Sequence, residues 1–293
     1  MHEPVMVAEV MTQLRPDRGG VFVDCTVGFG GHAHAMLEAG ATRLLALDRD
    51  QDALRLAGER LARWRDRVEL IHADYRQLPA VLNARGIDVV DGTLADLGVS
   101  SMQFDVPGRG FSFRVDEPLD MRMDRSTGPT AADLIQQVAE QELADVIFRF
   151  GEERYSRRIA RAIVRARSAA PVRSTGQLAA IVRRALPRKG HQRIDPATRT
   201  FQALRIWVNR ELEGLDTFLR DAARRLRAGA RLVVISFHSL EDRLVKHTFR
   251  ALEKGSDIAM RVLTKRPVTP SDEERARNPR ARSAKLRAAE RAA

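Results

Sequence analysis

The fold is decided by residues 21–33, which read Val21-Phe22-Val23-Asp24-Cys25-Thr26-Val27-Gly28-Phe29-Gly30-Gly31-His32-Ala33. The first five are an apolar run that predicts a buried strand, and the glycines predict a tight turn into a helix. Gly28 to Ala33 satisfies the pattern G-x-G-x-x-A, and Asp48 follows 20 residues after Gly28. Glycine lets the backbone approach a ligand, and an acid that ends the next strand accepts ribose hydroxyls. The stretch predicts a Rossmann-like nucleotide site.

Outward from this stretch, apolar runs alternate with helical patterns as far as residue 97. Such alternation predicts a parallel α/β sheet. The predicted strands are Val21–Cys25, Arg43–Asp48, Val68–Ile71 and Ile87–Leu97, and the predicted helices are His34–Ala39, Asp50–Trp64 and Leu78–Ala84.

The alternation stops after residue 104 and resumes near residue 196. We therefore predict a Rossmann-like domain at 1–104 and 196–293, interrupted by an inserted all-helical domain at 105–195. In the insertion, Phe104–Asp124 predicts a structured loop, followed by helices at Thr130–Phe150, Tyr155–Arg167 and Thr175–Leu186. The later segments are a basic linker at Arg188–Pro196, a long helix at Thr198–Arg227, a strand at Arg231–Phe237, and an antiparallel edge hairpin of Ile258–Leu263 with Ser283–Ala288.

Positive charge is concentrated in one segment of the chain. The formal net charge is +11, and residues 149–210 hold 16 Lys or Arg against 3 acidic residues. A uniformly basic protein can simply reflect an arginine-rich genome, but a local excess favours a surface for a polyanion. We expect the insertion to recognise nucleic acid.

Several protein classes are disfavoured by composition. No stretch approaches the roughly 18 apolar residues of a membrane span, and the N-terminus lacks the pattern of a secretory signal. The single cysteine, Cys25, excludes an internal disulfide and a cysteine-based zinc site. No metal-ligand spacing stands out, so we predict no metal. A soluble cytoplasmic protein is expected.

The glycine pattern alone fits NAD as well as S-adenosylmethionine. Two later motifs favour the methyl donor: His72-Ala73-Asp74-Tyr75 ends the third strand, where methyltransferases place groups beside adenine, and Asp96-Leu97-Gly98-Val99 ends the fourth, where they place the reaction centre. A dehydrogenase would also need a base at the hydride site, and the sequence offers no persuasive candidate.

Taken together, the motifs resemble those of a known family, the bacterial 16S rRNA (cytosine-N4)-methyltransferases, also called the RsmH or MraW family. The matching blocks run in order through almost the whole chain. They are residues 24–32, Asp96-Leu97-Gly98-Val99-Ser100-Ser101-Met102-Gln103, Arg109-Gly110-Phe111-Ser112-Phe113, Pro118-Leu119-Asp120-Met121-Arg122-Met123-Asp124, Ser236-Phe237-His238-Ser239-Leu240-Glu241-Asp242-Arg243, and residues 278–287.

The resemblance implies transfer of a methyl group from S-adenosylmethionine to the exocyclic amine of a cytosine in the decoding region of 16S rRNA. It also implies cofactor contacts at Gly30, Gly31, His32, Asp48, Tyr75, Asp96 and Gln103. Two of these residues have ordinary alternatives, since His32 can be a histidine at a helix start and Tyr75 can be core packing. An aromatic face against adenine gives Tyr75 a physical reason to be there instead.

The chemistry points to Asp96. The exocyclic amine of cytosine is a poor nucleophile, and an acceptor for its N–H would stabilise the developing positive charge. DNA amino-methyltransferases place Asn or Asp there, followed by Pro-Pro and an aromatic. Here only the acid is present, so the stacking aromatic stays open among Phe104, Phe111, Phe113 and Phe237.

Other residues near these motifs have more than one interpretation. Cys25 lies on the first strand, so packing is expected and attack at cytosine carbon 5 is disfavoured. His238 and Glu241 would assist proton release, while Ser239 with Asp242 equally predicts a helix cap.

Two other functions are compatible with parts of the pattern: a non-catalytic rRNA-binding protein and an NAD-dependent oxidoreductase. The expected partner is 16S rRNA in the small ribosomal subunit or in a late assembly intermediate, with no membrane. A homodimer is among the oligomeric states that the sequence allows.

Overall fold

The computed structural model describes residues 3–99, 103–104, 106–187, 195–255 and 258–292. The chain divides into two compact units. The sheet unit comprises Met1–Gly98 and Leu212–Ala293, and the helical unit comprises Val99–Glu211. The predicted basic linker lies almost wholly outside the described residues, which include neither Arg188 nor Lys189.

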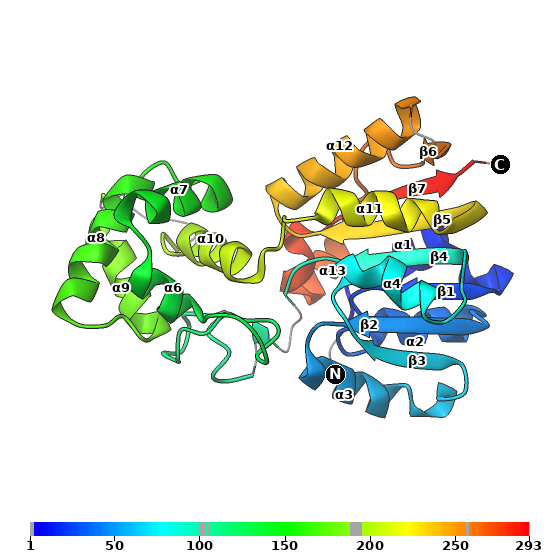
Figure 1. The fold of residues 1–293 in the computed structure, drawn as a ribbon, viewed down its shortest axis with the longest axis horizontal. Helices are drawn as coiled ribbons and strands as arrows, with labels where there is room; N and C mark the ends of the chain where they lie inside the picture. The colour runs from blue at the N-terminus through cyan, green and yellow to red at the C-terminus, as the bar shows by residue number, and fades with distance from the viewer. Residues whose placement is uncertain (1–2, 100–102, 105, 188–194, 256–257, 293) are drawn as a thin grey trace. The chain divides into compact units, whose positions relative to one another are not determined.

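The sheet unit is built on seven described strands in the order β3-β2-β1-β4-β5-β7-β6 (Figure 1). Strands β1 to β5 run parallel, whereas β7 is antiparallel to both β5 and β6. This confirms the Rossmann-like sheet and the antiparallel pair at its edge. The strands are β1 (Val21–Asp24), β2 (Arg43–Asp48), β3 (Val68–His72), β4 (Val90–Asp96), β5 (Leu226–Ser236), β6 (Met260–Val262) and β7 (Lys285–Arg291).

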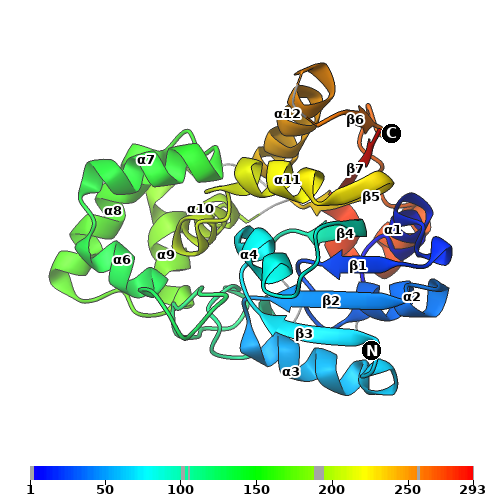
Figure 2. The ribbon, with the colours of Figure 1, turned by 45° about the vertical axis from the view of Figure 1, so that its right-hand side comes forward.

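Helices cover both faces of the sheet because its buried strands are apolar on both sides. Along β5, Leu232 and Val234 pack against one set of helices, while Val233 and Ile235 pack against the other. The first face carries α4 (Leu78–Asn83), α11 (Leu215–Arg224) and α12 (Ser239–Gly255), and the second carries α1 (Val7–Leu14), α2 (Gly31–Ala39) and α3 (Gln51–Arg60) (Figure 2). Short elements complete the unit: α13 (Asp272–Arg277), η1 (Pro16–Arg18), η2 (Ala62–Trp64), η3 (Tyr75–Gln77) and η4 (Pro279–Ser283).

The register brings three carboxylates to the side of the sheet where the parallel strands have their carboxyl ends, which is called the reaction edge below. Asp24 is level with Ala46 of β2, and Asp48 and Asp96 are the last residues of β2 and β4. Because these strands are parallel and adjacent, their carboxyl ends lie together, which is where open α/β sheets bind ligands.

The glycine turn needs glycine for two different reasons. Gly30 has φ 74°, caps α2, and donates its N–H to the Val27 carbonyl at 2.7 Å. At Gly31, a Cβ would lie 2.8 Å from Cβ of Pro4, so the N-terminal segment can pass only over a glycine. Helix α2 begins at Gly31 and not at His34 as predicted, which places His32 inside its first turn.

The helical unit has its own core, formed by α6 (Ala131–Gln137), α7 (Glu140–Gly151), α8 (Ser156–Ala169), α9 (Thr175–Ala185) and α10 (Thr198–Asn209). The single helix predicted over Thr130–Phe150 is wrong, since the chain is extended at Val138 and Ala139 between α6 and α7. Val138 is buried in the core of the unit. The break therefore serves tertiary packing.

The single helix predicted over Thr198–Arg227 is also wrong. Helix α10 ends before Arg210, which is left-handed at φ 50°, and α11 starts after Gly214 at φ 70°. The side-chain amide of Asn209 fixes this end, because its Nδ2 donates to the Met121 carbonyl and its Oδ1 accepts from Met123 N, both at 2.7 Å. Strand β5 consequently starts at residue 226, five residues before the predicted start at 231.

Helix α10 belongs to the helical unit because it packs against α7. The predicted insertion bounds of 105–195 leave this helix out, whereas the compact unit runs from Val99 to Glu211. No helix in the described part of the chain is long and apolar enough to cross a membrane.

Candidate active site

Asp48 holds the glycine turn in place. One carboxylate oxygen accepts the N–H of Gly28 at 2.8 Å, and the other accepts the N–H of Asp50 at 2.9 Å. Burial raises the pKa of Asp48 to about 6, although the two N–H groups oppose the shift. A carboxylate oxygen can accept more than one hydrogen bond, so a ribose hydroxyl can still be bound there.

Asp96 ends β4 beside His32. Its backbone N–H donates to the Thr26 hydroxyl at 2.7 Å, and its Oδ2 lies 3.7 Å from Nδ1 of His32. The other ring nitrogen, Nε2, is 2.8 Å from the carbonyl of Val5. A carbonyl can only accept, so Nε2 carries a proton and the Nδ1 side of the ring faces Asp96.

Buried oxygens at this edge have no hydrogen-bond partner among the described residues. They are Oδ1 of Asp96 and Oδ2 of Asp24. Buried polar atoms are rarely left unsatisfied, because each costs about 1–3 kcal/mol. Two such oxygens at the carboxyl ends of neighbouring strands point to a ligand that brings hydrogen-bond donors or positive charge.

The electrostatics of the edge agree with that interpretation. Burial raises the pKa of Asp24 to about 7, with a further contribution from the charge of Asp48. Burial, followed by the charges of Asp24 and Glu241, raises the pKa of Asp96 well above its usual range. Carboxylates whose charge is this unfavourable gain most from a cationic ligand.

His238 and Glu241 form a buried pair between β5 and α12. Nδ1 of His238 accepts the backbone N–H of Glu241 at 3.3 Å, and its Nε2 lies 3.2 Å from a carboxylate oxygen of Glu241. The second oxygen of Glu241 accepts the N–H of Phe237 at 3.0 Å. His238 thus takes part in capping α12, whereas the Asp242 carboxylate pairs with Arg287 at 2.6 Å.

A protein-family model described as the MraW methylase family matches residues 1–292. The chain belongs to this family. Relatives named ribosomal RNA small subunit methyltransferase H agree along nearly their full length. The relative from Pelobacter propionicus is 49% identical over 306 residues, covering 99% of this chain and 98% of its own. Those from Bradyrhizobium diazoefficiens and Sorangium cellulosum are 50% and 51% identical over 302 and 290 residues, covering 99% of this chain and 91% and 90% of their own.

Membership of the MraW family makes the chain a methyltransferase whose methyl donor is S-adenosylmethionine. The NAD-dependent alternative is thereby overturned. The donor carries a sulfonium and an ammonium group, so it fits a site where burial raises the pKa of nearby carboxyls and where Oδ2 of Asp24 has no partner among the described residues. When bound, it supplies an electrophilic methyl group.

The sheet unit brings together most residues that the sequence predicted for this MraW site. Gly30, Gly31, His32, Asp48 and Asp96 all lie on β1, β2, β4 or the turn and helix that follow β1. Gln103 is buried in the helical unit, so its cofactor contact stays a prediction.

Tyr75 has a packing role that the sequence had allowed. Its ring centroid lies 4.7 Å from that of Phe218 in α11, at an angle of 53°. Tyr75 is half-buried, so part of its ring surface remains accessible beside the contact with Phe218. Contact of the remaining surface with adenine stays a prediction.

Sequence reasoning missed Asp24 as a site residue. The signal was present, because Asp24 ends its strand as Asp48 and Asp96 end theirs. Its burial and its unpartnered oxygen come only from the fold. Thr26 was missed as well, and its hydroxyl holds the backbone of Asp96.

Cys25 has the packing role that was predicted. Its thiol is buried, and burial, with the charges of Asp24 and Asp74, raises its pKa well above the usual range. A thiol in this state is a poor nucleophile because the thiolate is the reactive form.

Proposed function

We propose that this chain transfers a methyl group from S-adenosylmethionine to the exocyclic N4 of a cytosine in the decoding region of 16S rRNA. The observation that carries the proposal is the unpartnered, buried Oδ1 of Asp96 at the end of β4. An amine N–H is the kind of donor that this oxygen lacks. The names of the relatives support rRNA as the substrate class.

Asp96 is proposed to accept one N–H of the cytosine amine and to hold its nitrogen toward the methyl group. Its backbone is fixed by Thr26 and its side chain is flanked by His32. A preorganised acceptor of this kind costs little reorganisation when positive charge develops on the nitrogen. Cofactor contacts are proposed at Gly30, Gly31, His32, Asp48, Tyr75, Asp96 and Gln103.

His238 is a weaker candidate for receiving the amine proton. With Nδ1 accepting from Glu241 N, the proton of a neutral ring lies on Nε2, toward the Glu241 carboxylate. In this arrangement neither ring nitrogen serves as an acceptor for substrate. We propose that His238 acts as a positioning residue for Glu241.

Of the four aromatic candidates, Phe237 belongs to the sheet unit, which also holds Asp96. A Cβ at Gly98, two residues after Asp96, would lie 3.5 Å from the Phe237 ring. In the helical unit, Phe111 and Phe113 pack into or against the core, and Phe104 is 40% exposed. We propose that Phe237 flanks the target base.

The helical unit is proposed to bind rRNA. Helix α8 buries Ile159, Ala160 and Ile163 in the core of its unit and exposes arginines on its other side. Arg157, Arg161 and Arg165 are spaced by four residues, so they lie on one face of the helix. This stripe suits a phosphate backbone. Within the stripe, Arg161 lies 3.5 Å from the Glu140 carboxylate, a looser contact than the 2.8 Å ion pair of Arg183 with Asp195, so Arg183 is the less suitable residue.

The test is transfer of labelled methyl groups to small ribosomal subunits and to protein-free 16S rRNA, with mass mapping of the modified nucleotide. Methyl-N4-cytosine in the decoding region is expected. Transfer to neither substrate would contradict the proposed target in 16S rRNA, and label on carbon 5 would contradict the proposed chemistry.

The role of Asp96 is tested in single turnovers. Asp96→Ala should lower the methylation rate by about a hundredfold or more, while Asp96→Asn, which keeps a carbonyl acceptor, should retain more activity. Asp66→Ala removes an exposed carboxylate elsewhere in the sheet unit and should leave the rate unchanged. Full rescue of Asp96→Ala by excess S-adenosylmethionine would show that Asp96 only binds the cofactor.

A further inference from the structure

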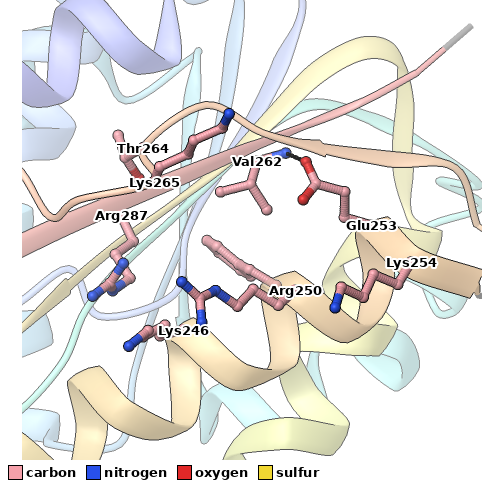
Figure 3. Close-up of a pocket in the computed structure, with 9 residues that line it drawn as sticks. Lys246, Arg250, Glu253, Lys254, Val262, Thr264, Lys265 and Arg287 are labelled. Carbon is pink, nitrogen blue, oxygen red and sulfur yellow. Dashed lines mark hydrogen bonds between the residues drawn. The ribbon is translucent and has the colours of Figure 1, made fainter.

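A basic groove lies in the sheet unit between α12 and the strands β6 and β7, with a cavity volume of about 270 Å³ (Figure 3). Five of its nine lining residues are Lys or Arg and one is acidic. The cations come from both sides: Lys246, Arg250 and Lys254 from α12, Lys265 from the segment after β6, and Arg287 from β7.

Four of these cations have no acidic partner among the residues that the structure describes. Arg287 donates to Asp242 at 2.6 Å, and the Glu253 carboxylate accepts the N–H of Val262 at 2.9 Å. No ion pair among the described residues joins the other four lining cations to a carboxylate; they are Lys246, Arg250, Lys254 and Lys265.

Arginines elsewhere in the same unit are commonly paired. Arg231 lies 2.9 Å from Glu290, and Arg277 lies 2.6 Å from Glu3. A cluster of unpaired like charges is unfavourable by itself and attracts polyanions. The groove is thus a distinct concentration of positive potential.

The cations are arranged along a line and do not surround a single point. Lys246, Arg250 and Lys254 are four residues apart along α12, so they share one face and span about 12 Å at 1.5 Å per residue. A line of that length exceeds one phosphate group and suits a chain of phosphates.

The line also starts near the reaction edge. Helix α12 begins at Ser239, just after Phe237 and His238, and Lys246 follows seven residues later, about 10 Å along the helix. We propose that the groove binds the phosphate backbone of the substrate RNA along the stretch that leads away from the target cytosine, since Lys254 lies 15 residues, about 22 Å, beyond Ser239. This inference rests on the proposed function, and it places a second RNA contact on the sheet unit.

The test combines three exposed cations in one variant, Arg250→Gln, Lys254→Gln and Lys265→Gln. Binding of a single-stranded RNA spanning the target site is measured against salt concentration, without cofactor. Three lost phosphate contacts at about 0.7 each should lower the salt slope of log affinity by about 2, and affinity at 0.15 M salt should fall roughly 50-fold. KM for RNA should rise while kcat at saturating RNA and the affinity for S-adenosylmethionine stay unchanged.

Two further variants separate the groove from net charge. The charge-preserving variant, with Arg250→Lys, Lys254→Arg and Lys265→Arg, should keep the slope. A matched control changes three basic residues of the same unit outside the groove, Arg18, Arg60 and Arg65, to Gln and should alter the slope far less. An equal loss in this control, or an unchanged slope in the groove variant, would overturn the proposal. If RNA binding depends on the groove but no methyl group is transferred to 16S rRNA, the groove proposal stands and only the proposed reaction is contradicted.

Discussion

Asp24→Asn should stabilise the cofactor-free protein, and more strongly at pH 8 than at pH 5. Asp24 is 1% exposed, and its pKa is raised from 3.8 to about 7 by burial. A carboxyl with a raised pKa holds its proton more tightly in the folded state than in the unfolded state. Its contribution to stability is therefore greatest at low pH and is lost as the pH rises from 3.8 through about 7.

The size of the effect follows from the shift. A pKa increase of about 3 units, at about 1.36 kcal/mol per unit, corresponds to about 4 kcal/mol. Ionisation of Asp24 therefore lowers the unfolding free energy by about 4 kcal/mol at pH 8 and by only about 2 kcal/mol at pH 5. Asparagine has the shape of the protonated acid without the ionisation. The variant should gain about 2 kcal/mol in unfolding free energy at pH 5 and about 4 kcal/mol at pH 8.

The measurement is urea unfolding at both pH values, followed by tryptophan fluorescence. The chain has two tryptophans, Trp64 in the sheet unit and Trp207 in the helical unit, so a Trp207→Phe background reports on the sheet unit alone. Asp66→Asn, an exposed acid in the same unit, should change stability at neither pH. An equal gain at both pH values, or a loss, would show that Asp24 is not a buried acid of raised pKa.

Three further outcomes are expected. Asp48→Ala should weaken S-adenosylmethionine binding by tenfold to over a hundredfold, about 1.5–3 kcal/mol for a charged acceptor, and calorimetry giving an unchanged Kd would contradict the assignment. Changing the α8 arginines to Gln should lower the salt slope of RNA binding by about 2 at an unchanged cofactor Kd, and a constant slope would mean that they only face solvent; they are Arg157, Arg161 and Arg165. Asp24→Asn should weaken the binding of S-adenosylmethionine more than the binding of S-adenosylhomocysteine, because only the former carries a sulfonium charge. Equal losses of affinity for the two molecules would argue against a charge contact.

The sheet was predictable because its strands are apolar runs bounded by turn residues, a local signal. The two helix breaks were not equally visible. Val138 and Ala139 include no glycine or proline, and the chain becomes extended there to bury Val138 in the core of the helical unit. Gly214 did signal a break, but the left-handed Arg210 depends on Asn209 contacts with the loop at residues 121–123. Such contacts link positions about 86 residues apart and leave no local pattern.

The site residues divide along the same line. Asp48 was predicted from its spacing after Gly28, and Asp96 from its position at the end of the fourth predicted strand. Gly31 was assigned to the cofactor, yet the close approach of Pro4 already requires glycine there. His238 was predicted to assist proton release, and the structure adds that its Nδ1 accepts the backbone N–H of Glu241, which the sequence does not indicate. Residue type and position could be inferred from sequence, but which atoms remain available for a ligand could not.

The carboxyl groups of Asp24 and Asp96 connect the electrostatics of the site with the charge of the methyl donor. Without ligand, Asp24 and Asp96 are unfavourable as anions, as their raised pKa values show. A cationic methyl donor bound beside these carboxylates would relieve that cost, and we expect part of its affinity to come from this relief. S-adenosylhomocysteine, the product, lacks the sulfonium charge of the donor, so it would offset less of the cost of ionising these two carboxylates. The edge should therefore hold the donor more tightly than the product, and neutralising Asp24 should weaken that preference while making the empty fold more stable.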